Sequence, residues 1–230
     1  MNHWKDIWEK REDKVSYSSI LEKLMIIDGF DTGYGSISKD DFIQYIDYIK
    51  KFINIKKEDS IYDVGCGAGA FLYQFYKYGN RIGGADYSKK IIDIAKNYLN
   101  NADLSVCEAN QIDVKKKYDY VISNSVFIYF QSYKYAEEVL NKMVNKSVKC
   151  LAILDVNDFN KKEDFIEIRK RHLSEEDYYR RYQGLDHLFY KTDWFHDFAE
   201  KNNLKIEIHQ QNINNYHNNQ YRFNVFMWKK

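Results

Sequence analysis

Two acidic residues and a glycine-rich turn, all within segment 61–86, are the residues best placed to do chemistry. Asp63 lies inside a short apolar run that leads into a turn with glycine at positions 65, 67 and 69. Glycine is needed where a backbone approaches a ligand closely or takes positive φ. A glycine turn between a strand and a helix builds a nucleotide pocket at the C-terminal edge of a parallel sheet. Asp86 ends the next apolar run, about 20 residues after Gly65, where an acid is placed to hold ribose hydroxyls.

The glycine spacing separates two classes of nucleotide-binding enzyme. Dinucleotide-binding enzymes use G-x-G-x-x-G, which would put the third glycine at position 70, where this chain has Ala70. Here the third glycine is Gly69, and Asp63 stands two residues before the first. This pattern resembles that of class I S-adenosylmethionine-dependent methyltransferases, over about residues 58–160 by motif and elsewhere by topology. The resemblance implies S-adenosylmethionine as the cofactor.

The resemblance also implies a set of cofactor-binding residues. Asp63 would reach the methionine end of the cofactor, and Asp86 would accept hydrogen bonds from both ribose hydroxyls, since a carboxylate offers two acceptor oxygens. Tyr87 would lie against adenine and Glu108 at its edge. For Asp86 and Glu108 the alternative is a solvated loop acid, and Cys66 would contribute backbone only. The complete predicted set is Asp63, Gly65, Cys66, Gly67, Asp86, Tyr87, Ser88, Glu108, Ala109, Asn110, Ser123 and Asn124.

A basic, tyrosine-rich segment follows the fifth predicted strand and suits an anionic or heavily hydroxylated acceptor, because the planar fork of arginine fits a pair of oxygens. A solvated helix, whose arginines pair with neighbouring acids, is the alternative. A glycine-flanked tyrosine near the N-terminus is either part of a lid, together with Trp8 and Arg11, or a structural turn. The predicted acceptor-binding residues are Tyr34, Arg169, His172, Arg180 and Arg181.

Two residues are candidates for the catalytic group. His187 lies in an apolar stretch just after the basic segment, and Tyr129 follows the fourth predicted strand, where active sites of the resembled family open. A base matters only if the accepting atom carries a proton. A core histidine with a satisfied hydrogen bond is the alternative for His187, and Asp155 and Asp158 are further options for a base.

Apolar runs and helical periodicities alternate from residue 60 onward and predict an α/β fold. We expect a Rossmann-like three-layer sandwich, with a mostly parallel seven-stranded sheet, an antiparallel C-terminal strand pair and an N-terminal helical cap. The chain is predicted to form one domain. Its parts are a cap (1–58), a cofactor-binding core (59–156), an acceptor-side insertion (157–190), and a C-terminal helix with the strand pair (191–230).

Composition limits the possible partners. Lys and Arg number 35 against 34 Asp and Glu, so there is no basic field for nucleic acid. No apolar run is long enough to span a bilayer. Three widely spaced cysteines indicate buried, reduced thiols and no metal site, which predicts a cytoplasmic protein. The oligomeric state stays open.

These observations predict a small-molecule O-methyltransferase. The expected acceptor is a carbohydrate or a phosphate-bearing precursor, possibly for a bacterial surface polysaccharide. Two alternatives stay open: an NAD-dependent oxidoreductase, and a non-catalytic methyltransferase-like binding subunit.

Overall fold

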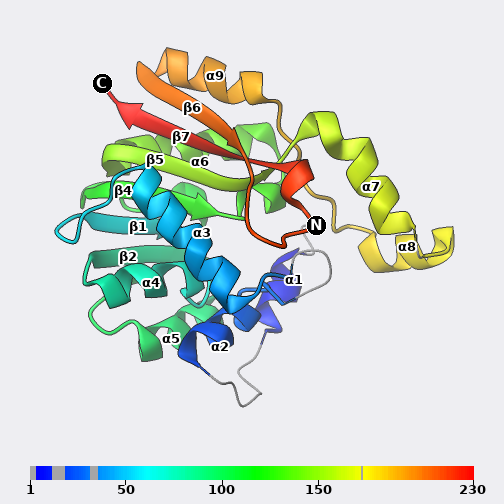
Figure 1. Ribbon diagram of the computed structural model, residues 1–230, viewed down its shortest axis with the longest axis horizontal. Coiled ribbons are helices and arrows are strands. Elements are labelled where there is room, and N and C mark those ends of the chain that lie inside the picture. Colours follow the sequence, from blue (N-terminus) through cyan, green and yellow to red (C-terminus); the bar gives the residue numbers. More distant parts are fainter. Residues whose placement is uncertain (1–3, 12–18, 32–35, 172) are drawn as a thin grey trace.

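The computed structural model, which describes residues 4–11, 19–31, 36–171 and 173–230, contains a seven-stranded sheet with strand order β3-β2-β1-β4-β5-β7-β6 (Figure 1). For Lys5 and Arg181 only the backbone is described. The strands are β1 (Ser60–Val64), β2 (Arg81–Asp86), β3 (Asp103–Val106), β4 (Tyr118–Asn124), β5 (Ser147–Asn157), β6 (Leu204–Gln210) and β7 (Arg222–Lys229).

The strand directions confirm the predicted fold class. β1 pairs in parallel with both β2 and β4, while β7 is antiparallel to β5 on one side and β6 on the other. β5 extends beyond the apolar run 150–154 at both ends. Its C-terminal end carries the polar residues Asp155 and Asn157, which lie beyond the apolar run. Both are buried: the Asp155 backbone amide donates to the side-chain oxygen of Asn224 on β7, and the Asn157 side-chain amide donates to the Leu188 carbonyl.

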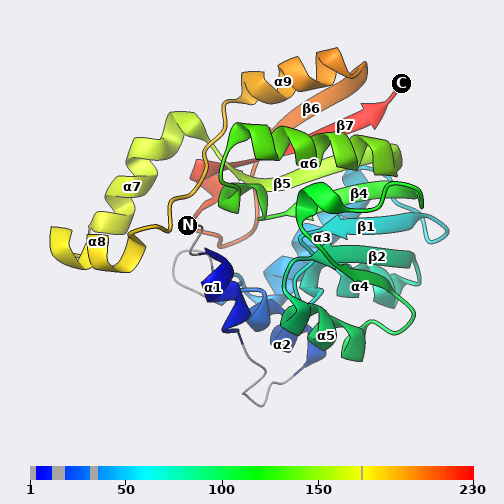
Figure 2. The same ribbon diagram turned by 180° about the vertical axis from the view of Figure 1, so that it is seen from behind.

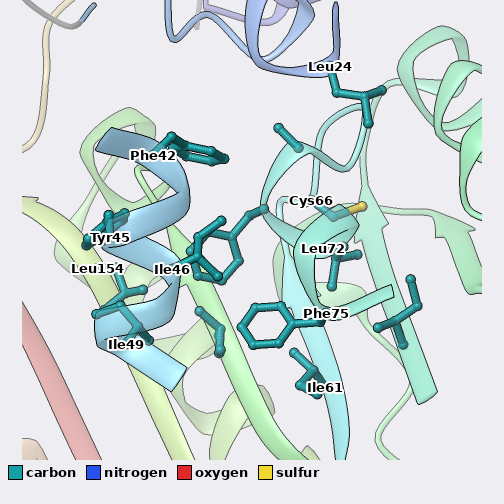
Figure 3. Close-up of a cluster of buried hydrophobic side chains, with 14 of the residues drawn as sticks. Leu24, Phe42, Tyr45, Ile46, Ile49, Ile61, Cys66, Leu72, Phe75 and Leu154 are labelled. Carbon is teal, nitrogen blue, oxygen red and sulfur yellow. The ribbon is translucent and has the colours of Figure 1, made fainter. Parts of the chain in front are cut away.

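Helices cover both faces of the sheet (Figures 1 and 2). One face carries α2 (Ile20–Ile27), α3 (Lys39–Phe52), α4 (Ala70–Tyr78) and α5 (Lys89–Tyr98), and the other carries α6 (Tyr133–Lys146) and α9 (Thr192–Lys201). α3 follows its apolar period: Phe42, Ile46 and Ile49 are buried in the same hydrophobic cluster as Phe75 of α4 and Ile61 of β1 (Figure 3). None of the helices in the described ranges is both long and apolar enough to cross a bilayer.

Serine side chains begin most of the longer helices. The Ser38 hydroxyl accepts a hydrogen bond from the Asp41 amide at the start of α3, and Ser88 caps α5 in the same way. Two further helices, α7 (Lys162–Lys170) and α8 (Glu175–Tyr182), project beside the sheet after β5, and the short α1 (Trp4–Glu9) lies near the C-terminal ends of the strands (Figures 1 and 2). These elements therefore stand at the edge where a nucleotide pocket is expected.

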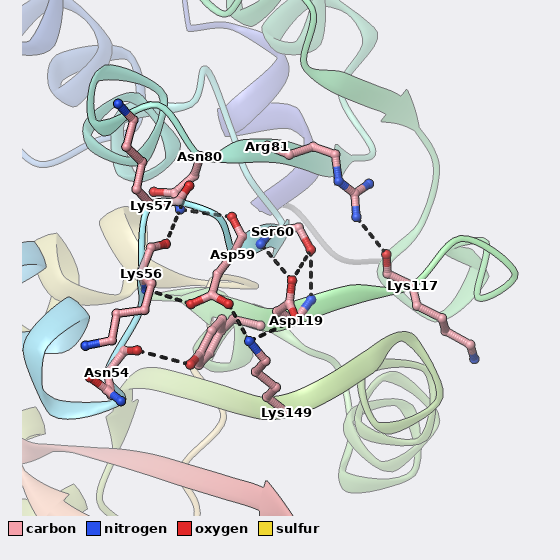
Figure 4. Close-up of polar contacts among 11 residues, drawn as sticks. Asn54, Lys56, Lys57, Asp59, Ser60, Asn80, Arg81, Lys117, Asp119 and Lys149 are labelled. Carbon is pink, nitrogen blue, oxygen red and sulfur yellow. Dashed lines mark hydrogen bonds and ion pairs between the residues drawn. The ribbon is translucent and has the colours of Figure 1, made fainter.

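The opposite edge of the sheet, where the parallel strands begin, is fastened by polar contacts (Figure 4). Lys149 bridges the carboxylates of Asp59 and Asp119, and Asp119 also accepts hydrogen bonds from the Ser60 amide and hydroxyl. The Asn80 amide donates to three backbone carbonyls before β1. These groups hold the strand starts in register and leave the other edge available for binding.

Candidate active site

A cavity of about 750 Å³ opens at the C-terminal ends of β1, β2 and β4. Its walls come from the glycine turn, the ends of these strands, and aromatic residues of the N-terminal segment. Most of the predicted cofactor residues line it, and Tyr129 does so as well. The lining residues that the sequence singled out are Asp63, Gly65, Cys66, Gly67, Asp86, Tyr87, Glu108, Ala109, Asn110, Asn124 and Tyr129.

Asp63 brings a buried carboxylate to the floor of the cavity. Its side chain is 2% exposed, and its Oδ1 has no hydrogen-bond partner among the described residues. Burial raises the pKa of this carboxyl well above its usual range, and the nearby Asp28 and Asp86 raise it further. An unpartnered buried oxygen is costly unless a ligand donor reaches it.

Asp86 ends β2 and holds the glycine turn in place. One of its oxygens accepts from the Gly67 amide at 3.2 Å and the other from the Ser88 amide at 2.9 Å. Burial raises the pKa of Asp86, and the two amides oppose that shift. Each carboxylate oxygen has two lone pairs, so both keep capacity for a ligand hydroxyl.

Asp28, at the C-terminal end of α2, is a pocket residue that the sequence reasoning missed. Its two oxygens accept hydrogen bonds from the amides of Ala68 and Ala70, at 2.6 and 2.9 Å. Burial raises the pKa of Asp28 to about 7, against the effect of these amides. One signal could have found it: α4 begins at Gly69, which has no side chain to cap the helix, so an outside acceptor is required.

Two glycines of the turn make room for protein side chains. A Cβ at Gly67 would lie 2.3 Å from an oxygen of Asp28, and one at Gly65 would lie 2.6 Å from Val126. Both glycines also have positive φ, at 55° and 77°. The turn is therefore tight because side chains from distant segments press against it, besides any need to approach a ligand.

Aromatic side chains form the end of the cavity beyond the strand tips. The ring centroids of Trp4 and Trp8, both on α1, lie 4.7 and 5.6 Å from that of Tyr129. Phe30 and Phe130 also line the cavity. No site role was predicted for Trp4, because its contact with Tyr129 joins segments far apart in the chain. This aromatic end suits the apolar part of a bound acceptor.

Two predicted cofactor residues do not line the cavity. Ser88 is 1% exposed, and its hydroxyl caps α5. Ser123 is fully buried in β4, and its hydroxyl donates to the carbonyl of Val64. Glu108 does line the cavity and accepts a hydrogen bond from the hydroxyl of Tyr135 at 3.3 Å.

The predicted acceptor residues lie outside the cavity wall as far as they are described. Arg180 is an exposed residue of α8 that pairs with Asp177, which agrees with the solvated-helix alternative. Arg169 lies on α7, one layer behind Tyr129, and does not line the cavity. Tyr34 and His172 lie outside the described residues, as does the side chain of Arg181.

His187 lies behind the aromatic end of the cavity and does not line it. Its ring stacks on Trp4 with centroids 4.8 Å apart, and Nδ1 lies 3.3 Å from a guanidinium nitrogen of Arg169. Because a guanidinium only donates, Nδ1 accepts and the ring proton sits on Nε2. Burial lowers the pKa of His187 well below its usual range, and Arg169 lowers it further. The lone pair that a general base needs is thus already engaged.

The other candidate bases are also committed to structural contacts. Tyr129 lines the cavity, but burial raises the pKa of its phenol, so the group remains a donor at neutral pH. Asp155 accepts from Ser125 and Tyr216 at one oxygen and from Gln211 at the other. Asp158 begins the short helix Phe159–Lys161 by accepting from the Asn160 amide.

The described cysteines and acids form no metal site. In the described ranges, no group of three or more His, Cys, Asp or Glu side chains is arranged to hold a metal ion. Cys66 and Cys150 are buried, as expected, whereas Cys107 is half-buried because it lies on the wall of the cavity.

Comparisons with known proteins agree with this architecture. A family model described as a methyltransferase domain matches residues 55–212. No curated protein sequence matches the chain.

Solved structures extend the comparison. Magnesium protoporphyrin IX methyltransferase from Synechocystis PCC 6803, with bound S-adenosylmethionine, is 14% identical with a TM-score of 0.62, covering 100% of this chain and 93% of that one. The plantazolicin methyltransferase BpumL, in complex with S-adenosylhomocysteine, is 18% identical with a TM-score of 0.63, covering 98% and 97%. A methyltransferase from Clostridium acetobutylicum ATCC 824 is 10% identical with a TM-score of 0.61, covering 88% and 96%.

Proposed function

Because the chain belongs to the methyltransferase-domain family, we propose that it transfers a methyl group from S-adenosylmethionine to a small-molecule acceptor. The observation that carries the choice of cofactor is the position of Asp28. The N-terminus of a helix is a ready site for an anion such as pyrophosphate. At the N-terminus of α4, the amides of Ala68 and Ala70 already donate hydrogen bonds to the carboxylate of Asp28.

The charge of the cavity supports the same choice. Asp28, Asp63 and Asp86 approach one another closely enough to raise the pKa of Asp63. A dinucleotide would bring its negative pyrophosphate against these three acids, at a cost in both repulsion and lost helix contacts. S-adenosylmethionine brings a sulfonium and an ammonium group, which these acids attract. The oxidoreductase alternative is therefore disfavoured.

The residues take the following proposed roles. Asp63 accepts from the ammonium group, Asp86 from the ribose hydroxyls, and the wall at Tyr87 and Glu108 receives the adenine. S-adenosylmethionine, when bound, supplies an electrophilic methyl group for in-line displacement from sulfur. The aromatic end formed by Trp4, Trp8 and Tyr129 would hold the acceptor and exclude water, and alignment of this kind contributes up to about 7–11 kcal/mol.

We keep oxygen as the proposed accepting atom, on a carbohydrate or phosphate-bearing molecule. An anionic oxygen is already nucleophilic and needs no base, which fits a cavity wall whose candidate bases are engaged elsewhere. No contact in the cavity bears on the polysaccharide role, which stays a prediction from the sequence.

Calorimetric titration tests the cofactor proposal. We expect S-adenosylmethionine and S-adenosylhomocysteine to bind and NAD to give no heat. Asp86→Asn should weaken S-adenosylhomocysteine binding by about tenfold to a hundredfold, because a charged acceptor of two hydroxyls is lost, and should lower the melting temperature modestly, because one of the two backbone amides loses its acceptor. Asp93→Asn, an exposed acid of α5 paired with Lys89, is the matched control and should leave the affinity unchanged. Binding of NAD in preference, or an unaltered affinity in Asp86→Asn, would overturn the assignment.

A panel of hydroxylated, phosphorylated and carboxylated metabolites with labelled S-adenosylmethionine tests catalysis. Transfer of label to an acceptor is expected. Cofactor binding without transfer to any member would favour the non-catalytic binding subunit.

A further inference from the structure

Two arginines and a histidine gather around Phe165 of α7, directly behind the aromatic end of the cavity. The guanidinium carbons of Arg169 and Arg222 lie 4.5 and 5.5 Å from the centroid of the Phe165 ring. The His187 ring lies 6.4 Å from the same centroid. His187 in turn packs against Trp4 and Tyr129, with centroids 4.8 and 5.3 Å apart. The cluster is thus one side chain away from the cavity.

The charges of this cluster do not balance. In the described part of the chain, Arg222 has one carboxylate partner, Asp155, at 3.6 Å, and Arg169 has none within 4.0 Å. Arg169 is half-buried, and the one hydrogen-bond contact described for its guanidinium is with Nδ1 of His187. Burial and the charge of Arg222 lower the pKa of Arg169. A cation that is partly withdrawn from water without a counter-ion costs stability, so its presence calls for an explanation.

Two buried donors of the cluster are also unsatisfied. Nε2 of His187, which carries the ring proton, has no hydrogen-bond partner among the described residues, and Nε of Arg222 has none either. Arg222 is only 3% exposed, so bulk water does not serve that group. Buried N–H groups in native proteins are nearly always paired. The guanidinium groups of Arg169 and Arg222 and the Nε2–H of His187 all lie around Phe165, and donors of these kinds match the oxygens of a carboxylate or phosphate.

We propose that Arg169, His187 and Arg222 form an anion-binding subsite that anchors a carboxylate or phosphate group of the acceptor behind Trp4 and Tyr129. This inference rests on the proposed function and specifies the acceptor class: a molecule with an apolar part for the aromatic end and an anionic group for the arginines. His187 and Arg169 are binding residues in this arrangement, and His187 donates a proton in a hydrogen bond without losing it.

The test uses the full chain saturated with S-adenosylhomocysteine, and histidines labelled with ¹⁵N. Inorganic phosphate, and acetate in a second series, are titrated at constant ionic strength while the Nε2 resonance of His187 is followed by NMR. We expect a saturable shift with both anions. Arg169→Gln should lower the association constant by about tenfold or more, because a charge-assisted hydrogen bond is lost. Arg180→Gln, the matched exposed arginine on α8, should bind as the wild type does. A shift that grows linearly without saturation, or an equal loss in both variants, overturns the proposal.

A second measurement, of the melting temperature, separates a loss of anion binding from a loss of folding. Arg169→Met should melt at or above the wild-type temperature, because it removes a cation that lacks a counter-ion. A clear drop in melting temperature would make Arg169 a structural residue and overturn the subsite. Failure of the wild type to bind S-adenosylhomocysteine would instead count against the proposed function, so the two failures are distinguishable.

Discussion

Asp28 connects the N-terminal segment to the glycine turn through one carboxylate. Its two oxygens accept hydrogen bonds from the amides of Ala68 and Ala70, at 2.6 and 2.9 Å, and its negative charge raises the pKa of Asp63. Because the raised pKa of Asp28 lies near 7, its protonation state changes over the physiological range. A single residue therefore sets both the local shape of the pocket and part of its charge.

Asp28→Asn tests that coupling through stability. The folded-state pKa of about 7 lies above the usual aspartate value of about 3.9, so the folded protein binds the extra proton between these values. The contribution of Asp28 to the free energy of unfolding is therefore fully present below about pH 4 and is lost as the pH rises to about 7. Between about pH 4 and pH 7, we expect the free energy of unfolding of the wild type to fall by about 1–2 kcal/mol relative to that of Asp28→Asn.

Urea unfolding of both proteins at several pH values between 4 and 8 measures this difference. Asp93→Asn serves as the control, and its difference from the wild type should stay flat. A difference between wild type and Asp28→Asn that does not change with pH would show that Asp28 titrates normally.

At the scale of elements, α4 differs from the helices that begin at a serine, because its cap comes from a distant residue. Serine hydroxyls cap α2, α3, α5, α6 and α8, at Ser19, Ser38, Ser88, Ser132 and Ser174. α4 starts at Gly69 and takes its cap from Asp28, at the end of α2. The packing of α2 and the shape of the cofactor turn are therefore coupled through the Asp28 side chain.

Gly67→Ala should destabilise the fold by about 1–3 kcal/mol, because φ is 55° and the new Cβ would meet Asp28 at 2.3 Å. Gly79→Ala is the matched control: its φ is also positive, but the new Cβ would meet the flexible end of Lys57 at 2.9 Å, so we expect a smaller cost. Chemical denaturation of the single variants, and of Gly67→Ala combined with Asp28→Ala, isolates the clash. Equal costs for the two glycines, with no recovery in the double variant, would count against it.

At the scale of the whole molecule, charge is distributed unevenly. The chain has a formal net charge of +1, yet three acids with raised pKa values face one cavity. A cationic ligand favours the ionised form of these acids and must therefore release protons on binding. The affinity for S-adenosylmethionine should rise as the pH increases from about 5 to 8.

Calorimetry in two buffers of different ionisation enthalpy counts the released protons. We expect a net release of protons when S-adenosylmethionine binds. For each proton released, the affinity should rise by up to about tenfold per pH unit. S-adenosylhomocysteine lacks the sulfonium charge and should show a weaker dependence. Binding that is independent of pH, or proton uptake, would contradict this account of the cavity.

Much of the architecture could be predicted from local patterns. Alternating apolar runs and helical periods identified the strands and helices, since they record which face of each element is buried. The glycine turn, Asp63 and Asp86 are close in sequence and belong to adjacent strands, so their meeting at one sheet edge followed from parallel topology.

Other features depended on contacts between segments far apart in the chain. Asp28 meets Ala68, Trp4 packs on Tyr129, and Arg169 lies behind the cavity wall. No spacing or period encodes such contacts, because they arise from how the N-terminal segment and α7 pack on the finished sheet. The sequence by itself determined the elements and the cofactor edge, and only the tertiary structure decided which charges surround the cavity and which arginine has no carboxylate counter-ion among the described residues.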